Sequence, residues 1–358
     1  MRRFVSVSVI ILCAVMSGRA QALDRLPKYQ PEETVTGTLR LWGHGSPDTD
    51  FMGKLVRSWE AGFRRYHPAI KFDNRMYGTA SAMGALYTGV GDLAILGREI
   101  WPNEISTFEK VFHYDPLGID ITTGSLDIRN MDFALNIFVH KDNPISKLTL
   151  TQVDAIFGSE HRRGSKNIRT WGELGLTGEW KDKPIHVYGF PTSRGFAVFF
   201  QSIVLDDSHK WNCDLKEFAD VKQPDGKLLD GGLRILDALK DDPFGIAYSN
   251  LRYMNPQVKA LALAPNDGGP YYGATKENLI QRNYPLTRFI TTFINRAPER
   301  PVDPKVKEFL RYILSREGQE AIVRDGNYLP LSADSIRDQL KKLESPAQIT
   351  VTRKISQF

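Results

Sequence analysis

Residues 185–205 read IHVYGFPTSRGFAVFFQSIVL, and this stretch combines the patterns of a strand, a turn and a helix. Residues 185–188 are apolar enough for a short buried strand. Gly189 and Pro191 then predict a sharp turn, because glycine frees φ and proline fixes it. Apolar side chains recur at three- and four-residue steps over 196–203, which is typical of a helix packed on a core. A strand that runs through a tight turn into a helix indicates an α/β protein.

The predicted helix opens at Thr192, Ser193, Arg194 and Gly195. The first turn of a helix has unpaired backbone N–H groups and partial positive charge, so it attracts anions. Hydroxyl and guanidinium groups at the same place add donors, and arginine suits an oxyanion bidentately. The alternative is that a hydroxyl merely caps the helix and Arg194 is a solvated charge.

Residues 1–22 have the pattern of a secretory signal peptide. Arg2 and Arg3 form the charged start, an apolar run too short to span a bilayer covers 5–16, and Ala20-Gln21-Ala22 is a small-x-small cleavage site. The pattern predicts a soluble periplasmic or secreted protein. An ordinary export signal fits the arginine pair better than a twin-arginine signal, although both routes remain open.

The charge of the chain gives little reason to expect a nucleic-acid partner. The whole sequence has 47 basic and 42 acidic side chains, and the signal removes three of the basic ones. Cys213 is then the one cysteine left, which excludes an internal disulfide, and we expect a buried thiol there. The seven histidines lack the close spacing of a zinc site, so neither a metal nor a cofactor is predicted.

The first third of the chain alternates strands and helices. This order is typical of a mainly parallel sheet covered by helices, in which ligands bind beyond the carboxyl ends of the strands. Three strand ends are rich in small and donor residues, namely Gly45-Ser46, Gly78-Thr79-Ala80-Ser81 and Gly97-Arg98. The strands and helices are predicted at 36–42, 51–63, 70–75, 83–87 and 92–96.

Two long apolar strands are predicted at 131–140 and 284–294, on either side of a second α/β segment. They indicate that one lobe is inserted in another, with a hinge and a ligand cleft between them. The expected organisation is a signal peptide at 1–22, a first lobe formed by 23–133 and 285–358, and an inserted lobe at 134–284.

Several stretches resemble the periplasmic phosphate-binding proteins of phosphate ABC transporters, the PstS-like family of the type II periplasmic binding fold. The similarity extends over nearly all of residues 35–332 and is carried by 148–158 (LTLTQVDAIFG) with Trp171, by 244–248 (FGIAY), by 284–288 (YPLTR) and by 309–331 (FLRYILSREGQEAIVRDGNYLPL). The resemblance implies a two-lobed α/β fold. It also implies a monomer that binds inorganic phosphate or a similar oxyanion and delivers it to a membrane permease.

The resemblance also implies which residues hold the ligand. The family's four ligand segments correspond to Gly45-Ser46, to Gly78-Thr79 with Ser81, to Arg98, and to the segment from Gly189 to Gly195 that contains Thr192, Ser193 and Arg194. The last segment departs from the family pattern, because the family arginine is replaced by Gly189 and Ser-Arg-Gly stands in place of Ser-Gly-Thr.

A second departure concerns how phosphate is selected. Some family members have an acid where this chain has Arg98, and a buried carboxylate there can accept the proton of monohydrogen phosphate. With Arg98 there, the acceptor comes from elsewhere, with Asp48 and Asp50 as candidates, or the site does not select phosphate in this way. The alternatives are a sensor or adhesion module that has changed or lost its ligand, and a hydrolase. A hydrolase is disfavoured because Pro191 stands where a nucleophile elbow at Ser193 requires glycine.

Overall fold

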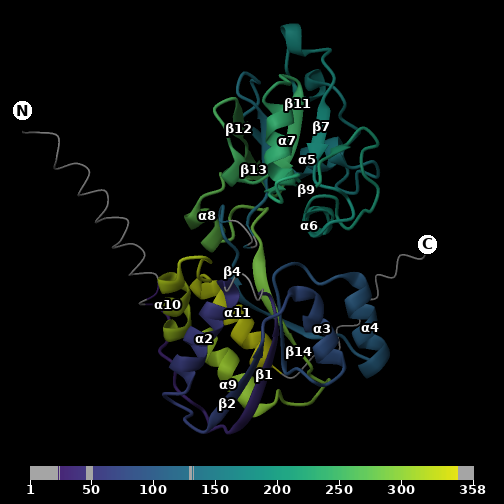
Figure 1. Ribbon diagram of the computed structural model, residues 1–358. Coiled ribbons are helices and arrows are strands. Elements are labelled where there is room, and N and C mark those ends of the chain that lie inside the picture. Colours follow the sequence, from purple (N-terminus) through teal and green to yellow (C-terminus); the bar gives the residue numbers. More distant parts are fainter. Residues whose placement is uncertain (1–22, 24, 46–50, 129–130, 132, 346–358) are drawn as a thin grey trace, which may run out of the picture. The chain divides into compact units, whose positions relative to one another are not determined.

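The chain forms two compact units that are joined by two crossings. The structure, a computed structural model, describes residues 23, 25–45, 51–128, 131 and 133–345 (Figure 1). Unit 1 contains the chain up to Thr122 and again from Phe289, and unit 2 extends from Thr123 to Arg288. The crossings predicted from the sequence lie at 133/134 and 284/285. The predicted signal peptide, Ser46, Asp48 and Asp50 lie outside the described residues.

Unit 1 is built on a five-stranded sheet with the strand order β2-β1-β3-β14-β4. β1 pairs in parallel with β2 and β3, as the alternation of strands and helices predicts, whereas β14 runs antiparallel to β3. The α/β fold class is therefore confirmed, with an antiparallel strand inside the sheet. The strands are β1 (Gly37–Gly43), β2 (Ile70–Arg75), β3 (Leu93–Leu96), β4 (Leu117–Thr123) and β14 (Phe289–Ile294).

Helices cover both faces of this sheet. Figure 1 shows α2, α9, α10 and α11 gathered on one face and α3 and α4 on the other. Leu55, Trp59 and Phe63 recur every four residues along α2 and are fully buried, as their spacing predicts. The helices are α2 (Phe51–Phe63), α3 (Thr79–Tyr87), α4 (Pro102–Phe112), α9 (Pro304–Ile313), α10 (Arg316–Asp325) and α11 (Ala333–Glu344).

Unit 2 contains a second mixed sheet, with the strand order β12-β5-β11-β7-β8. Successive side chains of its central strand β11 point to opposite faces of the sheet. Tyr248 contacts Phe157 of α5 and Phe200 of α6, whereas Ser249 donates a hydrogen bond to Gly232 O of α7. The main elements are β5 (Asn136–His140), α5 (Leu150–Phe157), β7 (His186–Gly189), α6 (Gly195–Ile203), β8 (Lys216–Glu217), α7 (Gly231–Leu239), β11 (Gly245–Ser249) and β12 (Val258–Ala260).

Smaller elements complete unit 2. β6 (Lys147–Thr149) pairs in parallel with β13 (Ala262–Ala264), and β9 (Val221–Lys222) pairs with β10 (Leu228–Leu229) in a hairpin. Three 3₁₀ turns and one short helix lie between the larger elements: η1 (Trp171–Leu174), η2 (Gly178–Trp180), η3 (Leu251–Tyr253) and α8 (Lys276–Ile280).

Three predictions about unit 2 and its crossings are wrong. The strand predicted at 131–140 begins only at Asn136, because Ala134 N–H bonds to Ser125 O and Leu135 N–H to Leu286 O in the crossings. The strand predicted at 284–294 begins only at Phe289, since Pro285 has no N–H to donate and 284–287 form a turn. Cys213 is exposed, because it lies in the turn that follows the buried Asn212.

The described residues contain neither a membrane-spanning helix nor a cluster of metal-binding side chains. None of the helices there has the length and apolar character to cross a bilayer. In the same ranges, no three His, Cys, Asp or Glu side chains are grouped so that they could hold a metal ion.

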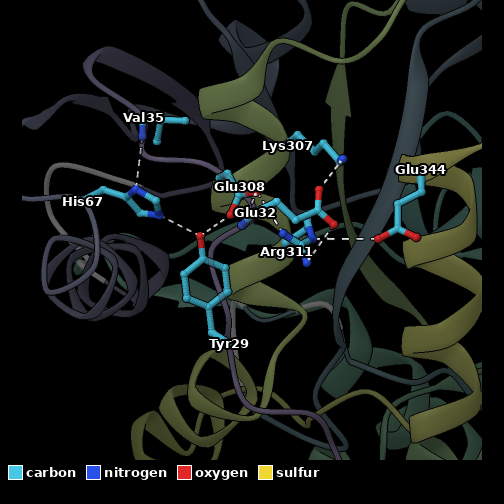
Figure 2. Close-up of polar contacts among 8 residues, drawn as sticks. All are labelled: Tyr29, Glu32, Val35, His67, Lys307, Glu308, Arg311 and Glu344. Carbon is cyan, nitrogen blue, oxygen red and sulfur yellow. Dashed lines mark hydrogen bonds and ion pairs between the residues drawn. The ribbon is translucent and has the colours of Figure 1, made fainter.

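A buried polar cluster attaches the segment that precedes β1 to the helices of unit 1 (Figure 2). Val35 N–H donates to His67 Nδ1 over 3.3 Å, which requires that this nitrogen carry no hydrogen. His67 Nε2–H therefore donates to the Tyr29 hydroxyl over 2.7 Å, and Tyr29 in turn donates to Glu308 Oε2 over 2.5 Å. Glu308 is fully buried on α9, so the chain of bonds fixes residues 29–35 through neutral His67.

The stability of the protein should therefore depend on the protonation of His67. Burial lowers the pKa of His67, although Glu308 opposes the shift. Below the unfolded-state pKa of about 6.5, the unfolded chain binds more protons at this site than the folded chain. The free energy of unfolding should fall as pH decreases through this range, relative to a His67→Gln variant in which the other titrating groups are unchanged. Urea titrations of both proteins between pH 7.5 and 5 test this, and parallel curves would contradict it.

Candidate functional site

The three predicted loops of unit 1 meet at the carboxyl edge of its sheet. His44 N–H, just after β1, donates to Ile95 O in β3 over 2.9 Å, and Gly78 N–H, just before α3, donates to Gly43 O over 2.9 Å. Parallel strands end at one edge of a sheet, and these bonds hold the loops together there. The structure thus brings together Gly45, Gly78, Thr79 and Gly97, which the sequence predicts for this site.

Glycines allow this close approach. A Cβ on Gly43 would lie 1.9 Å from Ile95 O, and a Cβ on Gly45 would lie 2.6 Å from Met76 O. Gly78 has φ +131, a backbone conformation that other residues rarely adopt. Small residues in the predicted loops are therefore required by the packing of the loops themselves, in addition to any role towards a ligand.

The start of α3 has the features of an anion-binding helix terminus. Gly78 is the N-cap and has no side chain to cap the helix. The Thr79 hydroxyl accepts a hydrogen bond from Gly97 N–H over 3.1 Å, whereas the Ser81 hydroxyl donates to Gly78 O over 2.9 Å. Thr79 is thus fixed between two loops and still has a hydroxyl proton to donate, while the proton of Ser81 is already used.

His44 is a component of this site that the sequence analysis did not single out. Its Nε2 lies 2.7 Å from the Tyr328 hydroxyl and its Nδ1 lies 3.4 Å from the Thr79 hydroxyl. The ring also fills the space over Gly97, where a Cβ would lie 2.0 Å from His44 Nδ1. The sequence shows His44 inside a glycine-rich loop, but its partners are distant in the chain.

Substitution of Gly97 should therefore disturb the site more than substitution of a helical glycine nearby. Gly97→Ala is expected to lower the free energy of unfolding by about 1–3 kcal/mol, because the new methyl displaces the His44 ring. Gly84→Ala, inside α3 and with only the Tyr87 ring in ordinary contact, is expected to raise it by about 0.5–1 kcal/mol. Chemical denaturation measures both values, and equal effects of the two substitutions would contradict the packing described here.

Arg98 lies beside the same loops, but its charge is already balanced. Its guanidinium makes two hydrogen bonds to Glu104, of 2.8 and 2.7 Å, and a third to Glu99 O of 2.8 Å. It also lies 4.0 Å from the centre of the Trp101 ring. These contacts hold Arg98 against the first turn of α4 and leave Nε–H and one Nη2 hydrogen for other partners.

In unit 2, α6 begins at Gly195 as the sequence predicts. Its N-cap is Arg194, and no side chain caps the helix, so neither Thr192 nor Ser193 acts as an N-cap. Thr192 instead bonds to the Glu217 carboxylate, through its N–H over 3.0 Å and its hydroxyl over 2.9 Å. Glu217 is a second contact that the sequence analysis missed, because it comes from β8, well beyond the helix.

Ser193 and Arg194 are exposed at the uncapped start of α6. Within the described ranges, the Arg194 guanidinium has no hydrogen-bond or ion-pair partner. The buried Arg288 guanidinium lies 5.3 Å from the centres of the Phe196 and Phe199 rings of α6. This terminus can therefore offer backbone N–H groups, a hydroxyl and a free guanidinium to an anion.

Comparisons with known proteins agree with this architecture. The sequence matches the PBP superfamily domain over residues 30–317. It is 31% identical over 347 residues to the phosphate-binding protein PstS of Pseudomonas aeruginosa, covering 96% of this chain and 99% of that protein. Protein SphX of Synechococcus elongatus is 24% identical over 222 residues, which is 61% of this chain and 59% of SphX. The crystal structure of PstS from Borrelia burgdorferi has a TM-score of 0.52 at 15% identity, covering 84% of this chain and all of that one.

The fold and these matches define a member of the PBP superfamily. Within it, the chain belongs to the PstS-like family, whose members are binding proteins and not enzymes. The resemblance identified in the sequence is thereby confirmed, and so is the prediction that the chain is not an enzyme.

Proposed function

We propose that the chain is an exported solute-binding protein that binds inorganic phosphate, a tetrahedral oxyanion, and delivers it to an ABC permease in the membrane. The observation that carries the proposal is the uncapped start of α6, where exposed Arg194 has no partner within the described ranges. A guanidinium beside unpaired helix N–H groups suits a phosphate ion in both charge and hydrogen-bond geometry. Membership of the PstS-like family supports the same ligand, since the Pseudomonas aeruginosa relative is named as a phosphate-binding protein.

Each unit contributes one set of donors in this proposal. In unit 1 the α3 terminus supplies backbone N–H groups and the Thr79 hydroxyl, and in unit 2 the α6 terminus supplies backbone N–H groups and Arg194. The proposed ligand residues are Gly45, Ser46, Gly78, Thr79, Ser81, Arg98, Thr192, Ser193, Arg194 and Gly195.

Arg194 provides the sharpest test of this site. Arg194→Ala is expected to weaken phosphate binding by about 1–3 kcal/mol, the contribution of a charge-assisted hydrogen bond. Arg252→Ala removes an equal charge from an exposed position of unit 2 and is expected to leave the affinity unchanged. Calorimetric titration of both variants gives the comparison. If Arg194→Ala binds phosphate as tightly as the wild type, Arg194 does not belong to the site.

A second candidate is a PstS-like sensor or adhesion module that has changed or lost its ligand. It is favoured by the carboxylates that already occupy two predicted donors, Glu104 on Arg98 and Glu217 on Thr192. Such a module would bind none of phosphate, sulfate or molybdate, whereas the first candidate binds phosphate.

Export is the remaining part of the proposal. The pattern of residues 1–22 supports cleavage after Ala22 and release of the mature chain into the periplasm. Amino-terminal sequencing of the protein from the periplasmic fraction should then begin at Leu23. An intact amino terminus in that fraction would contradict cleavage.

A further inference from the structure

His44 joins two hydroxyl groups at the centre of the unit 1 loops. It is 9% exposed, and its two ring nitrogens lie within hydrogen-bond distance of different residues. Nε2 is 2.7 Å from the Tyr328 hydroxyl, and Nδ1 is 3.4 Å from the Thr79 hydroxyl. A buried imidazole in this position can orient the Thr79 hydroxyl, according to which ring nitrogen carries the hydrogen.

The hydrogen-bonding capacity of Thr79 shows how this control works. A threonine hydroxyl has one proton to donate and two lone pairs that accept. Gly97 N–H already occupies one lone pair, over 3.1 Å. A hydrogen on His44 Nδ1 would occupy the other, so that the proton of Thr79 has to point away from both groups.

We propose that His44 is a positioning residue of the phosphate site, which aims the Thr79 hydroxyl proton at the bound oxyanion. The Tyr328 hydroxyl donates to Nε2 and thereby fixes the tautomer with its hydrogen on Nδ1. Nδ1–H then donates to Thr79, and Thr79 donates to the oxyanion. The inference rests on the proposed function, because it needs an oxyanion next to Thr79.

This arrangement improves binding by organising the donor in advance. A hydroxyl that rotates freely loses that freedom when a ligand arrives, whereas a hydroxyl held by two donors does not. The successive bonds from Tyr328 through His44 and Thr79 also polarise one another, which strengthens the last bond to a negative ligand. Neutral His44 thus acts on the anion through Thr79 and does not contact it.

Two substitutions distinguish the contributions of the two ring nitrogens of His44. The amide of asparagine lies close to where Nδ1 lies in histidine, and the amide of glutamine lies close to where Nε2 lies. His44→Gln keeps the bond to Tyr328 and loses the one to Thr79, so it should weaken phosphate binding about tenfold. His44→Asn keeps a donor for Thr79 and should stay within about threefold of the wild type.

A double-mutant cycle then shows whether His44 acts through Thr79. In a Thr79→Ala background, His44→Gln should cause no further loss of affinity, because the hydroxyl that it aims is gone. Tyr328→Phe should weaken binding about threefold, since it removes the bond that fixes the tautomer. All affinities are measured by calorimetry with inorganic phosphate on the full mature chain, and thermal unfolding of each variant shows that it is folded.

The outcomes distinguish this inference from the proposed function. If the wild type binds phosphate and His44→Gln binds it equally well, or if His44→Asn loses more than His44→Gln, the role of His44 is overturned and the phosphate site stands. If the wild type binds no phosphate, both are overturned. Should His44→Gln fail to fold, Tyr328→Phe decides, and an unchanged affinity of that variant overturns the role.

Discussion

Replacement of Arg311 by alanine is expected to lower the free energy of unfolding by about 3–5 kcal/mol, because it leaves a buried carboxylate without its cation. Arg311 lies on α9 and bonds to Glu308, whose side chain is fully buried, over 2.9 Å. The same guanidinium reaches Glu32 over 3.1 Å and Glu344 over 3.8 Å (Figure 2). One side chain therefore joins the segment before β1, helix α9 and helix α11, and its loss affects all three.

Arg324→Ala is the matched control for this prediction. Arg324 is on the neighbouring helix α10, is 65% exposed and lies 3.6 Å from Glu320 in a surface ion pair. Removal of such a pair should change the free energy of unfolding by less than about 0.5 kcal/mol. Urea unfolding followed by circular dichroism gives both values. Equal values for Arg311→Ala and Arg324→Ala would show that the buried cluster contributes no more than a surface pair.

Replacement of Phe200 by alanine is expected to have an effect of similar size, about 3–5 kcal/mol, because it leaves a cavity in the core of unit 2. Phe200 is fully buried on α6. Its ring centre lies 4.4 Å from that of Tyr248 in the sheet, 5.4 Å from that of Trp211 and 5.2 Å from that of Phe157 in α5. This aromatic cluster holds α6 on the sheet, and therefore fixes the terminus at which Arg194 lies.

Ser202→Ala serves as the control on the same helix. Ser202 is exposed, and alanine is the better helix former, so the free energy of unfolding should stay within about 0.5 kcal/mol of the wild-type value. Unfolding monitored by near-UV circular dichroism, which reports on the aromatic cluster, gives the comparison. A Phe200→Ala protein as stable as Ser202→Ala would contradict the proposed support of α6.

Helices and strands could be predicted where apolar residues recur at the spacing of a helix or a strand. Phe51–Phe63 and Ile70–Arg75 have the bounds expected from the sequence, and α6 begins at the expected turn. Helix α4 was missed although Pro102 stands in its first turn and Glu104 accepts a hydrogen bond from Trp101 N–H at its start, which are both signals of a helix start. The strand predicted at 284–294 started too early because its prediction relied on apolar character alone. Residues 284–288 lie in a crossing and not in a strand.

In the candidate site, too, some residues could be proposed from the sequence and others could not. Gly78, Thr79 and Arg194 could be proposed from the sequence because each lies in a turn between a predicted strand and a predicted helix, which is a local pattern. The sequence indicated Arg98 as a ligand residue and did not show its pairing with Glu104. His44 could not be identified, since its role depends on Gly97 and Tyr328, which the fold brings to it from other parts of the chain.

Calorimetric titration of the ligand-stripped mature protein with phosphate, and in parallel with sulfate, tests the central claim most directly. Stripping by unfolding and refolding is needed, because a tight site can be purified with its ligand already bound. We expect a one-to-one isotherm with phosphate, and an absence of heat with sulfate would then mean that an acceptor in the site selects the protonated ion. An absence of heat with phosphate would contradict the account.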